Sequence, residues 1–354
     1  ELSRAHALYY LALAESAQPE VSAPLQAGVW ALLDEEYDNL RAALRWAIRR
    51  REAEIGTELG LTLWRFWASR IHMSEGRQWL EAVLALGAAE DRTAVAEPPL
   101  PARRWAFLHL VAGILASAQG DYDRAVVLFE ESLALYQDLG DRKGTSGPLR
   151  ELGIVAYHRG DYERAVRLNE QALAISREFG SSFGAALTIY NLSDALRAQG
   201  DHERAWKLLE ESLASVQSQK YPLRVAYARA ATLARLGSIE CEFGDVERAS
   251  ELYARSLDIE RRFEFKFEAV ASLEGLARVS AMQGRPEQAA RILGVSAALR
   301  EELGTLLTPI ARADHDHAVD TARAALGDDA FEAAWAVGHA LSLEGAVALA
   351  VGDD

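Results

Sequence analysis

A short turn recurs along this chain at a nearly fixed distance, and it constrains the fold more than any other feature. Each copy pairs a glycine with a following aspartate, and leucine- and alanine-rich sequence comes after it. The glycines are Gly120, Gly160, Gly200, Gly244 and, where arginine replaces the aspartate, Gly284. The steps between them are 40, 40, 44 and 40 residues. A period of this size predicts a solenoid of stacked helix pairs, which contacts partners over an extended surface.

The residue types of the turn predict its local structure. Glycine has no side chain, so it can adopt the left-handed backbone conformation that ends a helix. The aspartate can then cap the next helix by accepting a hydrogen bond from a free backbone N–H group. An alanine five residues after each glycine lets the two helices approach closely, and these alanines are Ala125, Ala165, Ala205, Ala249 and Ala289.

The residues around these turns are similar to the tetratricopeptide repeat. That repeat has a small residue near position eight, alanine at twenty, a large apolar residue at twenty-four and a small one at twenty-seven. The first copy here carries Gly113, Ala125, Phe129 and Ser132 at these places, whereas the second has Asn169 where an apolar residue is expected. The resemblance covers residues 103–303 as five repeats. It implies an all-α fold, a right-handed superhelical solenoid of tetratricopeptide-like helix pairs.

The N-terminal residues 1–87 predict a separate helical block. Its apolar periodicity indicates helices over 1–18 and 25–50 and a divergent helix pair over 54–86, in which Gly76 takes the alanine position. Tryptophans are concentrated in this half of the chain. Aromatic residues at helical spacing favour core packing, and a ligand-stacking aromatic box is the alternative. The tryptophans concerned are Trp30, Trp46, Trp64, Trp67, Trp79 and Trp105.

Two further segments lie outside the repeats. Residues 88–102 hold three prolines that cannot lie inside a helix, so we expect a surface loop there. Residues 304–354 predict three short helices that cap the array. We expect Asp328 or Asp329 to cap the second of these helices and Ser342 to open the third.

Composition and charge argue against several classes of protein. The formal charge of −15 predicts no direct nucleic acid contact, because binding to phosphates needs a basic surface. No apolar run approaches the ~20 residues of a membrane span, and we expect neither a membrane contact nor a signal peptide. Cys241 is the single cysteine and cannot form an internal disulfide, which indicates a cytoplasmic location.

Motifs for catalysis and cofactor binding are missing from the sequence. None of the four lysines follows a glycine, so the chain has no phosphate-binding loop, and we expect neither an enzyme nor a cofactor site. The densest group of metal-ligand residues is Asp314-His315-Asp316-His317. Consecutive residues point around a helix, so this run predicts a solvated helical turn rather than a metal site.

A larger resemblance covers nearly the whole chain. The segments "LLDEEYDNLRAALRWAI" at 32–48 and "SEGRQWLEAVLAL" at 74–86, together with the closing "ALGDDAFEAAWAVGHALSLEGAVALA", carry it. They resemble the C-terminal halves of bacterial signal-transduction ATPases and transcriptional regulators of the LuxR and MalT type. In that family a nucleotide-binding domain and a winged helix precede a helical-repeat sensor region. The resemblance implies that the chain is a fragment with an ATPase domain upstream as a partner.

The resemblance to tetratricopeptide arrays also implies where a partner binds. Their concave wall is built from the first helix of each pair, and an asparagine at the place of Asn191 often holds a bound peptide backbone. The alternative is that these side chains pair with one another across repeats. The partner-binding residues nominated in this way are Arg150, Tyr157, His158, Tyr190, Asn191, Asp194, Arg197, Glu242, Glu274 and Arg278.

Two functions follow from these observations. The first is a non-catalytic sensor region that binds a protein, a peptide segment or a small effector and controls an ATPase or transcriptional regulator. The second is a stand-alone tetratricopeptide adaptor or peptide receptor without an ATPase. A phosphate-binding loop upstream of residue 1 would decide for the first.

Overall fold

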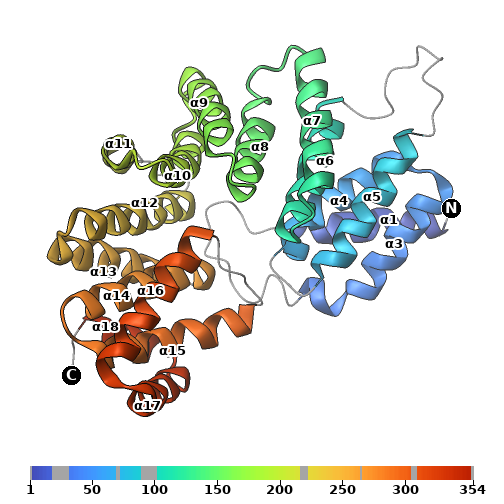
Figure 1. Cartoon of the computed structure of the whole chain (residues 1–354). Helices are drawn as coiled ribbons and strands as arrows, with labels where there is room; N and C mark the ends of the chain where they lie inside the picture. The colour runs from blue at the N-terminus through green and yellow to red at the C-terminus, as the bar shows by residue number, and fades with distance from the viewer. Residues whose placement is uncertain are drawn as a thin grey trace. The chain divides into compact units, whose positions relative to one another are not determined.

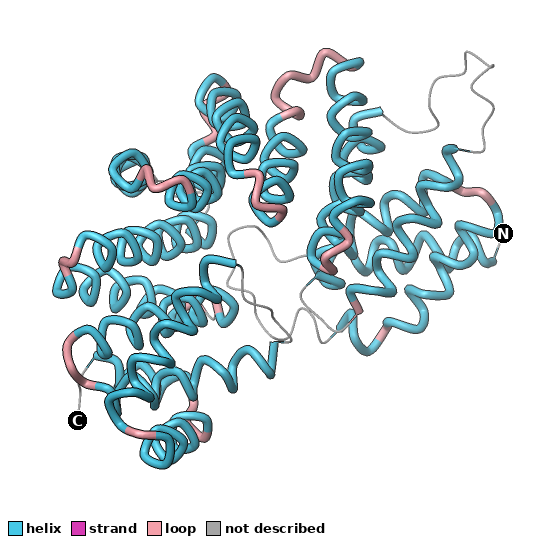
Figure 2. The backbone as a smooth tube through the Cα atoms, viewed as in Figure 1, coloured by secondary structure: helices cyan, strands magenta, loops and turns pink. Residues whose placement is uncertain are grey.

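We describe the chain from a computed structural model over residues 2–17, 32–68, 72–88, 102–215, 222–263, 265–303 and 309–351. Every regular element in these ranges is an α-helix (Figures 1 and 2). None of these helices is both long and apolar enough to cross a membrane. The all-α fold of tetratricopeptide-like helix pairs is therefore confirmed, whereas its right-handed superhelical course stays a prediction. The end residues 88 and 102 of the expected loop are helical, whereas the rest of that loop and the start of the helix expected over 25–50 lie outside the described residues.

Helix packing divides the chain into two compact units. Unit 1 comprises Glu1–Arg159 and Arg167–Gly180, and unit 2 comprises Gly160–Val166 and Ser181–Asp354. We describe each unit by itself.

The N-terminal helices of unit 1 are α1 (Leu2–Ser16), α3 (Tyr37–Arg50), α4 (Ala53–Ala68) and α5 (Met73–Ala88). Their core contains Trp67, which is fully buried and donates a hydrogen bond from Nε1 to the Tyr37 hydroxyl at 3.0 Å. A Cβ atom on Gly76 would overlap the Trp67 ring, so this glycine makes room for the indole. Tryptophan here packs the core, as the first interpretation predicted. Further tryptophans half-buried against the same core are Trp46, Trp64, Trp79 and Trp105.

The repeats follow as helix pairs. In unit 1 they are α6 (Ala102–Ala118) with α7 (Tyr122–Asp138), and α8 (Ser146–His158) with α9 (Tyr162–Glu178), whose first residues belong to unit 2. In unit 2 they are α10 (Ser182–Ala198) with α11 (His202–Ser215), α12 (Pro222–Phe243) with α13 (Val246–Arg262), and α14 (Lys266–Met282) with α15 (Pro286–Leu303).

The turn within each pair has the structure that its residues predict. All five repeat glycines have φ between 72° and 85°, which is the left-handed region that glycine adopts without strain. The four aspartates cap the following helix, each accepting a hydrogen bond from the backbone N–H three residues on. These aspartates are Asp121, Asp161, Asp201 and Asp245.

Small residues set the distance between the helices of a pair. The five repeat alanines are fully buried. A Cβ atom on Gly113 would overlap the ring of Phe129, and Gly153 stands in the same relation to the buried Asn169. Asparagine therefore fills the place of the expected apolar residue and packs against the glycine as the phenyl ring does.

The C-terminal part of unit 2 consists of α16 (Pro309–Leu326), α17 (Asp328–His339) and α18 (Leu343–Val351), which matches the three expected helices. The Ser342 hydroxyl caps α18 by accepting a hydrogen bond from Gly345 N–H. The cap predicted for α17 is wrong, because Gly327 takes that place with φ 81°. The helix begins directly after this glycine, so Asp328 and Asp329 lie in its first turn, where their charge suits the helix N-terminus.

Helices α15 and α17 approach each other through glycines. A Cβ atom on Gly294 would overlap the backbone carbonyl of Trp335, and one on Gly338 would overlap the backbone of Arg291. Backbone cannot rotate away as a side chain can, so this crossing depends on both glycines. It fixes α17 against the last repeat.

We predict that Gly338→Ala destabilises unit 2 by about 1–3 kcal/mol, because the added methyl group forces α17 away from α15. Thermal unfolding followed by circular dichroism measures the change. Gly345→Ala is the matched control, since its Cβ atom meets only ordinary van der Waals contacts. An unchanged melting temperature for Gly338→Ala would show that α17 does not pack on α15 as described.

Candidate partner-binding site

Three of the predicted site residues lie on α8 in unit 1. Arg150 forms an ion pair with its neighbour Glu151 at 2.9 Å. His158 stacks on Tyr122 of α7 with ring centroids 5.5 Å apart, and the buried Tyr157 meets His158 edge to face. The stack of His158 on Tyr122 connects α8 to α7 within unit 1, so part of this chemistry is used in packing.

Unit 2 brings a second group of predicted residues together on its first helices. Helices α10, α12 and α14 pack side by side, and their facing residues form what we call the first-helix face. The guanidinium of Arg235 lies over the Tyr190 ring, 3.6 Å from its centroid. Arg235 also donates to the Asp194 carboxylate at 3.2 Å. A phenol ring and a carboxylate from α10 thus hold a cation from α12. The first-helix face comprises Tyr190, Asn191, Asp194, Tyr227, Arg235 and Glu268.

Beside this group, Arg197 and Glu242 join α10 to α12. The Arg197 side chain is only 6% exposed and donates to the Glu242 carboxylate. Glu242 also lies 2.5 Å from Nδ1 of His202 at the start of α11. Two predicted site residues are therefore held in an ion pair inside unit 2, and a ligand acid that reached Arg197 would compete with Glu242.

Asn191 differs from its neighbours on α10. Its side chain is half-buried, and it makes no hydrogen bond with any residue in the described ranges. An amide offers both donors and an acceptor, which is the chemistry that pairs with a peptide backbone. Asn191 is thus a predicted residue whose side-chain amide has no hydrogen-bond partner among the described residues.

The last two predicted residues lie on α14. The Glu274 carboxylate accepts hydrogen bonds from Ser296 of α15 at 2.9 Å and pairs with Arg300 at 2.8 Å. His315 of α16 is 3.3 Å away from the same oxygen. Glu274 therefore ties α14 to α15 and α16, and the half-buried Arg278 follows it one turn later.

Two carboxyl groups, Glu268 on the first-helix face and Glu260 next to it, have no cation within ion-pair distance among the described residues. Glu260 of α13 is fully buried, and its Oε1 accepts hydrogen bonds from Ser256 at 2.9 Å and Ser272 at 3.0 Å. Burial raises the pKa of Glu260 to about 7. Burial also raises the pKa of Glu268, and the nearby Tyr227 hydroxyl opposes that rise.

Sequence reasoning missed four residues of this arrangement, namely Tyr227, Arg235, Glu260 and Glu268. A signal existed for one of them. Arg235 occupies the repeat position that Asn191 occupies one repeat earlier, two residues before the small residue of its helix. The acids carry no such signal, because a glutamate in an amphipathic helix looks solvated until its burial is known.

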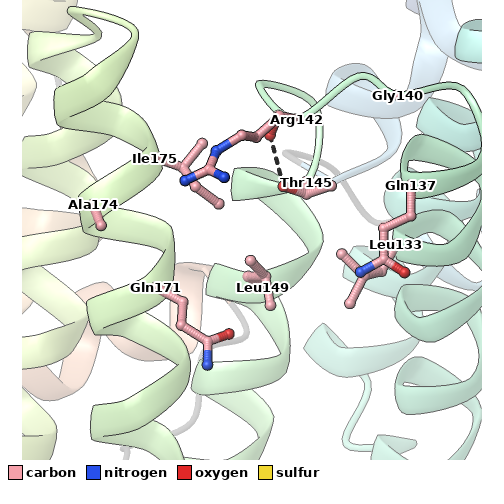
Figure 3. A pocket seen from close by; sticks show the side chains of 9 residues that line it. All are labelled: Leu133, Gln137, Gly140, Arg142, Thr145, Leu149, Gln171, Ala174 and Ile175. Atoms are coloured by element: carbon pink, nitrogen blue, oxygen red, sulfur yellow. Dashed lines mark hydrogen bonds between the residues drawn. The ribbon is translucent and has the colours of Figure 1, made fainter.

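A separate pocket of about 490 Å³ lies in unit 1 among α7, α8 and α9 (Figure 3). Its apolar lining comes from Leu133, Leu149 and Ile175, and Gln137 and Gln171 stand on opposite sides of it. Arg142 reaches over it but pairs with Glu178 at 2.9 Å. None of the predicted site residues lines this pocket. The described residues contain no group of three side chains able to hold a metal ion.

Comparisons with known proteins agree with this architecture. A family model described as "MalT-like TPR region" matches residues 114–315. No curated protein matches the chain.

Solved structures show the same fold at low sequence identity. Rap protein complexed with competence and sporulation factor is 16% identical, with a TM-score of 0.56 over 85% of this chain and 86% of that chain. The Rap conjugation gene regulator of plasmid pLS20, in complex with the Phr* peptide, is 14% identical, with a TM-score of 0.52 over 77% and 75%. The apo form of the quorum sensor NprR from B. thuringiensis is 14% identical, with a TM-score of 0.51 over 88% and 78%. These identities establish likeness of fold alone.

We predict that Glu260→Gln removes a pH-dependent loss of stability. The folded pKa of Glu260 lies above its ordinary value of 4.5, so the folded chain binds more protons than the unfolded chain between about pH 4.5 and 7. Stability therefore falls as pH rises through this window. Glutamine resembles the protonated acid and carries no charge. At pH 8 the free energy of unfolding of the variant should therefore exceed that of the unchanged chain by up to about 3 kcal/mol.

The test is chemical denaturation of both proteins at pH 5 and pH 8. We expect the stability difference between them to grow with pH. Glu247→Gln, which removes an exposed carboxylate from the same helix, is the matched control and should show no such growth. If the stability difference between Glu260→Gln and the unchanged chain did not depend on pH, Glu260 would not be a buried carboxyl group without a neighbouring cation.

Proposed function

The chain belongs to the family of MalT-like TPR regions, and on this premise we propose that it is a non-catalytic sensor region. Its first-helix face binds a peptide or protein segment, or a small effector. The observation that carries the proposal is the half-buried amide of Asn191, which has no hydrogen-bond partner in the described ranges and stands beside the Tyr190–Arg235–Asp194 group.

The chemistry of the first-helix face supports a ligand with mixed polarity. The Asn191 amide can pair with a peptide backbone, and the rings of Tyr190 and Tyr227 can pack on apolar side chains. A half-buried position weakens the competition from water, which strengthens each polar contact that a ligand makes. Two proteins of like fold are described with a bound ligand, namely Rap with competence and sporulation factor and the pLS20 regulator with the Phr* peptide.

In this proposal the sensor region acts on an ATPase or transcription-regulator partner, in the cytoplasm. Binding of the ligand would order the first helices, and the repeats would pass that change to the partner domain. The domain organisation proposed with it is an N-terminal helical block over 1–87, a loop over 88–102, five repeats over 103–303 and a cap over 304–354.

A stand-alone peptide receptor is the second candidate. The like fold of the pLS20 regulator, described with its peptide, favours it. The two candidates share the binding face and differ only in what the chain controls. The gene sequence upstream of residue 1 distinguishes them, since only the first requires a phosphate-binding loop there.

We predict that Asn191→Ala weakens ligand binding at least about tenfold, because a peptide group would lose hydrogen bonds worth roughly 1.4 kcal/mol. Peptides selected from a random phage-displayed library on the full chain serve as ligands, and fluorescence anisotropy measures their affinity. Helical content by circular dichroism should not change.

Glu210→Arg on α11 is the control, because it changes charge on a second helix and should leave the affinity unaltered. Normal binding by Asn191→Ala, with binding abolished by Glu210→Arg, would place the working surface on the second helices instead. No peptide binding at all would reject the peptide form of the proposal.

A further inference from the structure

The first-helix face of unit 2 holds one cation in a recognisable way. Arg235 stacks on the Tyr190 ring at 3.6 Å and donates to Asp194 at 3.2 Å. The ring supplies its negative face and the carboxylate its full charge, and both attract a guanidinium. Asp194 and Tyr190 lie one turn apart on α10, whereas the cation comes from the next first helix.

The same two chemical groups meet again farther along the face, this time without a cation. The Tyr227 hydroxyl of α12 lies close enough to the Glu268 carboxyl group of α14 for the two to interact electrostatically. The Phe265 ring adjoins Tyr227 edge to face, with centroids 5.7 Å apart. No lysine, arginine or histidine within the described ranges forms an ion pair with Glu268, and both Tyr227 and Glu268 are mostly buried but keep part of their surface in contact with solvent.

Glu260 provides an independent sign that a positive charge is missing. This side chain is fully buried, and its Oε2 has no hydrogen-bond partner among the described residues. Glu268 is close enough to repel it, and Arg235, the cation that faces it from α12, is already engaged with Asp194. A buried acceptor without a partner is costly, and an approaching cation would offset that cost.

We propose that Tyr227 and Glu268, with Glu260 behind them, form a subsite for a cationic group of the ligand. The guanidinium of an arginine side chain fits best, because the chain itself places one against the same two kinds of group, a phenol ring and a carboxylate, at Tyr190 and Asp194. The inference rests on the proposed function, since it names the chemical group that the first-helix face selects.

This arrangement also predicts that the binding of a cation depends on pH. Burial raises the pKa of both carboxyl groups, that of Glu260 to about 7, so near neutral pH the Glu260 carboxyl group is protonated in part of the molecules and a cation would displace that proton. The charged groups that face them are Arg235 from α12 and, from α14 and α13, the two acids themselves. Binding of a cation should therefore release protons and should strengthen as pH rises through 7.

The experiment uses the full chain and two small probes at constant ionic strength. N-acetyl-L-arginine amide carries a guanidinium whose charge does not change with pH, and N-acetyl-L-citrulline amide is its neutral isostere. By isothermal titration calorimetry at pH 8 we expect the arginine probe to bind at least about tenfold more tightly. This preference should shrink at pH 5.5, where the Glu260 carboxyl group is largely protonated.

Glu268→Gln should abolish the preference for the arginine probe, and Glu247→Gln, which removes an exposed charge from unit 2, should keep it. The comparison of the two probes on the unsubstituted chain needs no variant, so a folding defect of a variant cannot affect it. Titrations at pH 7 in two buffers of different ionisation enthalpy should reveal proton release on binding of the arginine probe.

Equal binding of the two probes, or arginine binding without proton release, would overturn the subsite. If selected peptides still bind through Asn191 in that case, the proposed function stands and only the cation preference is wrong. If the arginine probe binds as expected and no peptide does, the subsite stands and the peptide function fails.

Discussion

Close helix packing through a missing side chain is the constraint on which the other features depend. At Gly113 and Gly153 the backbone of the first helix lies directly against a side chain of the second, and at Gly338 two backbones meet. Such contacts allow only one distance between the helices. Because the left-handed glycine turns also fix the direction of each pair, successive first helices in unit 2 lie beside one another. Tyr190 and Arg235 can face each other only because of this repeated geometry.

Charge is balanced within unit 2 by pairs that join neighbouring first helices. Arg197 with Glu242 and Arg235 with Asp194 each link α10 to α12. Pairs of this kind are costly to break singly, because the partner left behind keeps its charge in a poorly solvated place. They therefore give the first-helix face a fixed pattern of charge. Glu260 and Glu268 are exceptions to the balance, which makes their surroundings the chemically distinctive part of the face.

The sequence predicts the features that depend on a few adjacent residues. The glycine turns and the aspartate caps need only local backbone geometry, and they occur where expected. The register also placed Tyr190, Asp194, Arg197 and Glu242 on first helices, and in unit 2 these side chains do meet. What their partners are could not be predicted, since Arg235 comes from a helix 41 residues after Asp194 and nothing local couples the two.

Burial of charge is the part that the sequence hides most completely. Glu260 lies on a second helix whose pattern of charged residues is that of a solvated surface, yet its carboxyl group is buried and accepts hydrogen bonds from serines of α13 and α14. The predicted cap of α17 was wrong for a related reason. An aspartate that follows a glycine can be either the cap or the first helical residue, and the φ of Gly327 decides between them.

The crossing of α15 and α17 sets a limit on how this array can change in length. Each repeat of a solenoid packs on its neighbours, so a repeat added at the end would need the surface of the last helix for its own packing. Here α17 covers that surface, with the backbones of Gly294 and Gly338 in contact with their neighbours. A longer version of this array, natural or engineered, would have to gain its extra repeat before α14 and keep the final pair together with its cap as one module.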